Sequence, residues 1–202
     1  MWAKFTVQGT LNYSTYDYII VFNTTGNGLT PLPNGGAQAN YAAFSDAFII
    51  SGNSGGGVVA VPVQFVRTGN TSLPPAVIAL NVPPQDVLFN ANSNNLETQF
   101  QITFERAIFS SLLSTPTPPA TPTPISKTWK ANCFVTQQGT INGSVSNYVP
   151  IDSLGVGDGT DTSYSAPNLN TTIAFDTTQT AEGPPTSDPS STILSCEFAN
   201  TP

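Results

Sequence analysis

The sequence contains no histidine and few charged residues. Only 8 % of its 202 residues are Asp, Glu, Lys or Arg, whereas a typical soluble domain has about 25 %. Without histidine, the chain has no Ser-His or Cys-His catalytic pair and no His-ligated metal. Its 12 acidic residues are scattered and form no distinctive motif. We therefore expect a protein that is not an enzyme and has no cofactor.

Basic residues are especially scarce: Lys and Arg together number 5, and the formal net charge is −7. Nucleic acids and anionic membrane surfaces are both bound through clustered cations. The longest apolar stretches, "YIIVF" at Tyr18–Phe22 and "VVAVPV" at Val58–Val63, are far shorter than the ~20 residues of a membrane-spanning helix. We expect neither nucleic-acid binding nor membrane insertion. The opening stretch "MWAKFTVQGT" lacks the apolar core of a signal peptide.

With so few charges, the surface must consist mainly of Thr, Ser, Asn, Gln and Gly. Such a surface produces little electrostatic repulsion between copies of the chain, which favours self-association. The alternative is an ordinary acidic secreted domain that stays monomeric.

The two cysteines lie in strand-like stretches, Cys133 in "WKANCFVT" and Cys196 in "STILSCEF". Alternate residues of both stretches are apolar, so both thiols face the same side as the core residues. They are either two free buried thiols or one disulfide, whose loop of about sixty residues would contribute ~4 kcal/mol. Because the other features indicate a protein outside the cell, we predict the disulfide and an extracellular or cell-surface location.

Apolar and polar residues alternate in several segments, as in "TQFQITFE" at Thr98–Glu105. Other segments, such as "DYIIVFN" and "AFIIS", are continuously apolar, which is typical of strands buried on both faces. Asn, Gly and Pro clusters separate them, and the Gly-rich "GNSGGG" is interpreted as a hairpin loop. The pattern predicts an all-β fold, an antiparallel β-sandwich of jelly-roll or Ig-like type, with about nine or ten strands and little helix. The weak helical candidate is Glu105–Ser114.

A Pro/Thr-rich connection at residues 114–127 interrupts the strand pattern. The part after it, residues 128–202, contains few strand-like stretches, and these would give a thin core of their own. We therefore favour a single sandwich over residues 1–202, with the connection as a polyproline-like strap. The alternative is a sandwich over 1–113 and a small disulfide-bonded module over 128–202.

Two kinds of polar motif are candidate sites. The loop "DSLGVGDGTDTS" offers Asp152, Asp158 and Asp161 as calcium ligands, although an exposed Asx-turn loop explains the same residues. N-x-[ST] sequons lie at Asn12, Asn23, Asn70, Asn142 and Asn170, and O-linked sugar is suggested at Thr115, Thr117, Thr121 and Thr123. In a chain so rich in Asn, Ser and Thr, chance also produces sequons.

The N-terminal segment "AKFTVQG" is a short amphipathic strand, with Ala3, Phe5 and Val7 on its apolar face. It either pairs within its own sheet or leaves its subunit to extend a neighbour's sheet. We expect the second arrangement, in which residues 1–8 make a repeating head-to-tail contact.

These features favour a non-enzymatic structural protein, a self-assembling subunit of an extracellular filament or cell-surface assembly. A second hypothesis is a carbohydrate-binding or adhesion module that contacts glycans through exposed tyrosines. The candidate tyrosines are Tyr13, Tyr16, Tyr18, Tyr41, Tyr148 and Tyr164. A third hypothesis is a shell protein of a virion or injection machine, which fits a disulfide less well.

Overall fold

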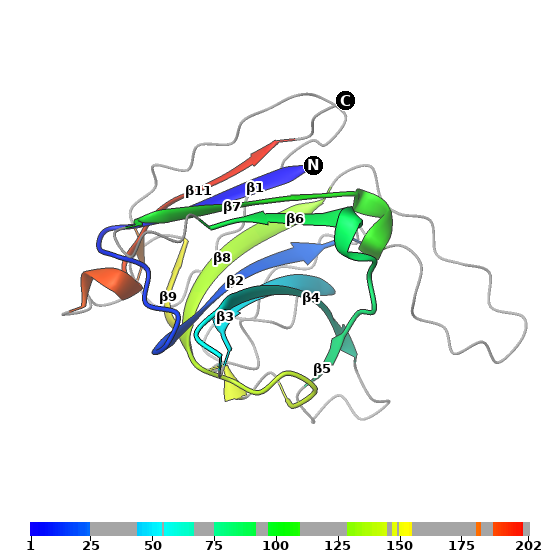
Figure 1. Ribbon diagram of the computed structural model, residues 1–202, viewed down its shortest axis with the longest axis horizontal. Helices are drawn as coiled ribbons and strands as arrows, with labels where there is room; N and C mark the ends of the chain where they lie inside the picture. Colours follow the sequence, from blue (N-terminus) through cyan, green and yellow to red (C-terminus); the bar gives the residue numbers. More distant parts are fainter. Residues whose placement is uncertain are drawn as a thin grey trace, which may run out of the picture.

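A computed structural model shows two antiparallel β-sheets packed face to face, which confirms the predicted all-β sandwich (Figure 1). The structure describes residues 1–24, 44–53, 55–66, 75–91, 97–109, 129–144, 147–148, 150–154, 181–182 and 188–199. The Pro/Thr-rich connection lies outside these residues.

The smaller sheet has four strands. In spatial order they are β11 (Ile193–Ala199), β1 (Trp2–Val7), β7 (Gln99–Phe104) and β6 (Val87–Asn90). Neighbouring strands are antiparallel, and β1 places Lys4 between Glu197 of β11 and Gln101 of β7. The first strand of the chain is therefore an interior strand of this sheet.

The larger sheet has seven strands. In spatial order they are β10 (Ala181–Glu182), β9 (Pro150–Leu154), β8 (Lys130–Gln137), β2 (Tyr16–Asn23), β3 (Asp46–Gly52), β4 (Val58–Val66) and β5 (Ala76–Ala79). The short 3-10 turns η1 (Pro84–Asp86), η2 (Arg106–Phe109) and η4 (Pro189–Ser191) accompany the strands, and the described part of the chain contains no α-helix. The weak helical pattern after Glu105 forms η2, and its remainder lies outside the described residues.

Strands from both sides of the Pro/Thr-rich connection share both sheets. β8 pairs along its length with β2, and β11 pairs with β1. The strands that follow the connection therefore pack in one sandwich with those that precede it (Figure 1).

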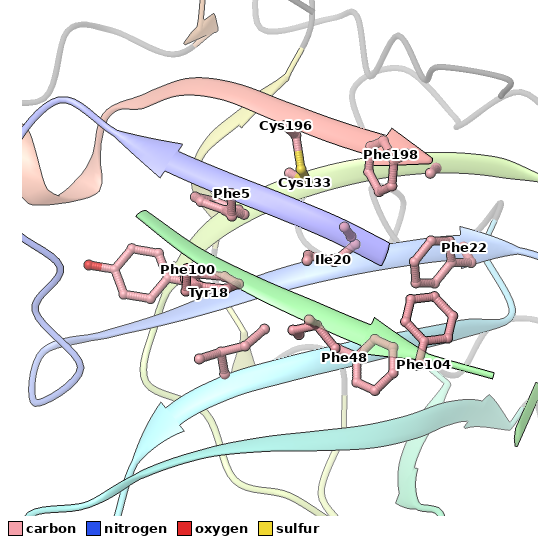
Figure 2. Close-up of a cluster of buried hydrophobic side chains, with 14 of the residues drawn as sticks. Phe5, Tyr18, Ile20, Phe22, Phe48, Phe100, Phe104, Cys133, Cys196 and Phe198 are labelled. Atoms are coloured by element: carbon pink, nitrogen blue, oxygen red, sulfur yellow. A yellow bond between two sulfur atoms is a disulfide. The ribbon is translucent and has the colours of Figure 1, made fainter. Parts of the chain in front are cut away.

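The main core lies between the sheets and is rich in phenylalanine (Figure 2). Phe5 of β1 stacks on Phe100 of β7 with ring centroids 5.2 Å apart, and Phe48 of β3 meets Phe104 of β7 at 4.8 Å. Each such ring buried contributes about 1.5–3 kcal/mol from area alone, and the paired ring geometry adds to this. The alternation of β1 and β7 in the sequence arises from this single buried face.

A second cluster covers the opposite face of the larger sheet. It includes Ile19 and Val21 of β2, Ala47 and Ile49 of β3, and Phe134 of β8. Strands β2 and β3 are therefore buried on both faces, which is why their sequences are continuously apolar.

The predicted disulfide is confirmed: Cys133 of β8 is bonded to Cys196 of β11 (Figure 2). Both residues are fully buried, and the described part of the chain has no free cysteine. Because β8 and β11 belong to different sheets, the bond fixes one sheet to the other across the core.

The expected exchange of residues 1–8 between subunits requires correction. Ala3, Phe5 and Val7 are at most 1 % exposed, and β1 pairs with β11 on one edge and with β7 on the other. Both edges of the strand and its apolar face are thus occupied within its own chain. An amphipathic pattern at a chain end is equally compatible with an interior strand, because alternation identifies a buried face and not the neighbour that buries it.

Candidate functional site

A groove lies at the end of the sandwich where four connecting segments meet. It is lined by residues 10–14 between β1 and β2, residues 52–53 and 56–58 of the β3–β4 hairpin, Gln138 after β8, and Ser190 of η4. Figure 1 shows the β1–β2 connection (blue) and η4 (orange) together at the left. Its volume is about 680 Å³, within the range of about 300–1,000 Å³ typical of ligand pockets. Loops at the end of a sandwich are also where such folds place binding sites.

Hydrogen bonds between backbones join these segments. The Gly9 N–H donates to the Pro189 carbonyl at 2.8 Å, which fixes the β1–β2 connection to η4. The Gly52 N–H donates to the Tyr13 carbonyl at 3.0 Å, which fixes the same connection to the β3–β4 hairpin. These bonds connect three of the four segments that line the groove.

Glycine is required at both of these contacts. A Cβ on Gly9 would lie 2.8 Å from Pro189 Cβ, and a Cβ on Gly52 would lie 2.5 Å from the Tyr13 carbonyl oxygen. Only a residue without Cβ allows the backbones to approach this closely.

Tyr18 supports the groove from below, although its side chain is fully buried. Its hydroxyl accepts the Asn12 N–H at 2.8 Å and donates to the Ser190 carbonyl at 3.0 Å. Asp188 stabilises η4 by accepting the Ser190 N–H at 2.9 Å and the Tyr16 hydroxyl at 2.7 Å. These two bonds hold the pKa of the Asp188 carboxyl below its usual range.

The tyrosines proposed as glycan contacts differ in their accessibility. Tyr13 lines the groove and Tyr16 is partly exposed. Tyr18 and Tyr148 are buried, so neither is available to a ligand, and their assignment as contacts is corrected. Tyr41 and Tyr164 lie outside the described residues.

Asp152, one of the three predicted calcium ligands, is buried and accepts the Ile193 N–H at 2.7 Å. This bond connects β9 to the start of β11. Asp158 and Asp161 lie outside the described residues, so the calcium site stays a prediction. Within the described ranges, no three His, Cys, Asp or Glu side chains gather in a metal-binding group.

The sequons differ in their accessibility. Asn23 is only 2 % exposed, so the folded chain cannot present it for glycosylation, and that candidate is corrected. Asn142 is exposed and its side-chain oxygen accepts the Ala79 N–H at 3.2 Å, whereas Asn12 lines the groove and is partly exposed. Asn70, Asn170, Thr115, Thr117, Thr121 and Thr123 lie outside the described residues.

Two buried carboxyl groups were not identified from the sequence. Asp46 is 1 % exposed and accepts the Thr24 and Ser45 hydroxyls, each at 2.7 Å, while its other oxygen is buried without a partner. Burial raises the pKa of Asp46 to about 6, although the two hydroxyls oppose the shift. Burial also raises the pKa of Asp17, which accepts the Gly139 N–H at 2.8 Å. No sequence pattern marks either residue, because each is buried by segments distant in the chain.

One half of β4 lies at an open edge of the larger sheet. β5 pairs with β4 only along Val63–Val66, whereas β3 pairs with the whole of Val58–Gln64. No strand of the described ranges pairs with the outer edge of Val58–Val61. Val59 on this half-strand is 37 % exposed.

The described ranges include no helix of the length and hydrophobicity that crossing a membrane would require. No protein-family model, curated protein or solved structure matches the chain. Any functional conclusion must therefore come from the geometry of the chain itself.

Proposed function

We propose that the chain is a non-enzymatic structural subunit of an extracellular or cell-surface assembly, in which copies join by strand addition at the open edge of β4. The proposal is supported by the half of this strand, Val58–Val61, with which no other strand of the described ranges pairs on its outer side. The proposed contact at Val58–Val61 replaces the one expected at residues 1–8, because both edges of β1 are paired within its own chain.

The direction of the backbone N–H and C=O groups identifies which residues of this edge could pair with an added strand. The Phe65 N–H donates to the Ser45 carbonyl beside β3, and the Leu80 N–H donates to the Pro62 carbonyl on the opposite side. Because N–H and C=O groups alternate between the two sides of a strand, Val58 and Ala60 direct theirs away from β3. These are the groups to which an added strand would bind.

The composition of β4 also favours strand addition. The segment "VVAVPVQFV" contains no charged residue, whereas charge is a common device against edge-to-edge pairing. Pro62 limits the contact, since it lacks an N–H and stands where β5 begins to cover the edge. By contrast, β5 is itself covered by a neighbouring turn, where Ala76 bridges to Ser144.

Val59→Lys should therefore weaken assembly while leaving the fold intact. The side chain is already 37 % exposed, so a lysine there changes stability little but places a charge on the pairing edge. We expect sedimentation velocity and electron microscopy to show assembly of the wild-type chain, with the variant requiring at least about tenfold more protein.

Ile78→Lys is the matched control, because Ile78 is 40 % exposed but lies on the covered strand β5. It should assemble as the wild-type chain does. A wild-type chain that stays monomeric at high concentration, or equal assembly by both variants, would reject strand addition at β4.

Carbohydrate binding is a second candidate function, favoured by a different observation, the uncharged groove at the loop end of the sandwich. Its chemistry is specific enough to be argued separately.

A further inference from the structure

The groove presents neutral hydrogen-bonding groups beside apolar surface. None of its lining residues, 10–14, 52–53, 56–58, Gln138 and Ser190, is Asp, Glu, Lys or Arg. We propose that the groove binds a neutral oligosaccharide, with amide groups of Asn12, Asn53 and Gln138 meeting its hydroxyls. Val58 also belongs to the β4 edge, so the groove adjoins the proposed assembly contact, but the proposal does not depend on assembly.

Asn53 has one end of its side-chain amide fixed by the hairpin. Its Oδ1 accepts the Gly55 N–H at 3.0 Å and the Gly57 N–H at 2.9 Å. Since both partners are donors, the oxygen must face them, and the orientation of the amide is determined. The Nδ2 group is left as a donor for a ligand.

The other two side-chain amides likewise have one end bonded within the protein and the other end available to a ligand. Gln138 donates from Nε2 to the Tyr13 carbonyl at 2.8 Å, which leaves its Oε1 as an acceptor. Asn12 accepts the Ser14 hydroxyl on Oδ1 at 2.8 Å, which leaves its Nδ2 as a donor. The groove thus offers two amide donors and one amide acceptor without any charge.

Tyr13 lines the groove without adding charge to it. Its hydroxyl is buried and has no hydrogen-bond partner, and burial raises the pKa of the phenol, so that it stays neutral. Because the hydroxyl has no exposed surface, we assign it no contact with the ligand.

A carbohydrate fits this combination better than other ligand classes. Each sugar hydroxyl both donates and accepts, as the amide groups require, and the C–H faces of a sugar ring match apolar surface from Leu11, Tyr13 and Val58. Phosphates and other anions need Arg or Lys, and metal cations need carboxylates. Neither type of side chain lines the groove.

Binding can be located by NMR on the unglycosylated, ¹⁵N-labelled full chain. The probes are cellohexaose, xylohexaose, mannohexaose, maltohexaose and chitohexaose, each at about 10 mM to detect millimolar affinity. We expect at least one probe to shift the backbone amides of residues 10–14 and 55–58. No shift with any of the five, or shifts confined to other surfaces, would overturn the proposal. Tighter binding of an anionic oligogalacturonate would also overturn the assignment to neutral sugar.

Asn12→Asp and Asn53→Asp, made together, test the donors directly. Each aspartate keeps the oxygen that holds the loop but replaces the Nδ2 donor with a charged acceptor that must lose water on binding. The pair should weaken binding about tenfold. Asn90→Asp, on an exposed residue of β6 outside the groove, is the matched control and should bind as the wild-type chain does.

Unchanged binding by the double variant would contradict the assigned donors. Assembly of the double variant should match that of the wild-type chain, because β4 Val59 is unaltered. Loss of sugar binding can therefore be distinguished from loss of assembly.

Discussion

Replacing Cys133 and Cys196 together by alanine should lower the free energy of unfolding by about 4 kcal/mol in the chain-entropy account of disulfides. The bond closes a loop with a sequence separation of 63, and without it the unfolded chain gains the conformational freedom of that loop. The loss should be measurable as a lower urea midpoint, and a steeper slope should report the more expanded unfolded chain.

Reduction of the wild-type chain provides the control for packing. The reduced chain keeps both buried sulfur atoms but lacks the bond, so it separates the loop contribution from the cavity that alanine leaves. We expect the reduced chain and the double variant to be destabilised to a similar extent. Two thiols that alkylate without reductant, or a double variant as stable as the oxidised chain, would contradict this result.

The effect is expected to be large because of where the bond lies. Cys133 and Cys196 connect two strands of different sheets across a core otherwise held by side-chain packing. With few charges in the chain, ion pairs contribute little to holding the sheets together; the described residues contain one, between Lys4 and Glu197 at 2.9 Å. A pair at the protein surface, as this partly exposed one is, contributes about 0–1 kcal/mol.

Local pattern was sufficient to predict which segments are strands and which of their faces are buried. The alternation of Phe100, Ile102 and Phe104 identified the core face of β7, and the matching phase of the two cysteines predicted their bond. The continuous apolar run of β2 correctly indicated burial on both faces. Each of these properties depends on side-chain periodicity within one short segment.

Strand neighbours and the groove could not be predicted in this way. Lys4 pairs with Glu197 across almost the whole chain, and no local pattern specifies that partner, so the first strand was placed wrongly at a subunit contact. The groove is formed by residues 10–14, 52–53, 56–58, Gln138 and Ser190. Each of these segments is simply a polar turn when considered separately, and only the sheet order brings them together.

Asp46 should make the chain less stable as the pH rises, whereas most acidic groups in folded proteins make the chain more stable as the pH rises. Asp46 has a pKa raised by burial to about 6, compared with an ordinary value of 3.8. The folded chain therefore holds a proton on Asp46 that the unfolded chain releases between these two values. Stability from this group is fully present below about pH 4 and is lost as the pH rises through 6, a difference of about 3 kcal/mol.

The geometry around Asp46 explains why ionisation is unfavourable. Among the described residues no basic side chain pairs with it, and its two hydroxyl partners, Thr24 and Ser45, bind the same oxygen. Gln64 lies directly opposite on β4, and its side-chain oxygen is also buried without a partner. Two acceptors on neighbouring strands lack a donor, and a proton on Asp46 supplies one.

Asp46→Asn should therefore stabilise the chain at neutral pH. Asparagine keeps an oxygen for the Thr24 and Ser45 hydroxyls, carries no charge, and offers its NH₂ group where the protonated acid would offer its proton. We expect the variant to match the wild-type chain near pH 4 and to exceed it by about 3 kcal/mol at pH 7. Urea unfolding at a series of pH values measures this difference directly.

Asp86→Asn removes one negative charge at a partly exposed position in η1 and serves as the matched control. Burial also raises the pKa of Asp17. Comparing each variant with the wild-type chain at the same pH removes the contribution of Asp17 to the pH dependence of stability. If the difference in free energy of unfolding between Asp46→Asn and wild type stays constant from pH 4 to pH 7, Asp46 does not titrate in this range. If this difference increases with rising pH for Asp46→Asn but not for Asp86→Asn, Asp46 is a group through which mild acid stabilises the fold.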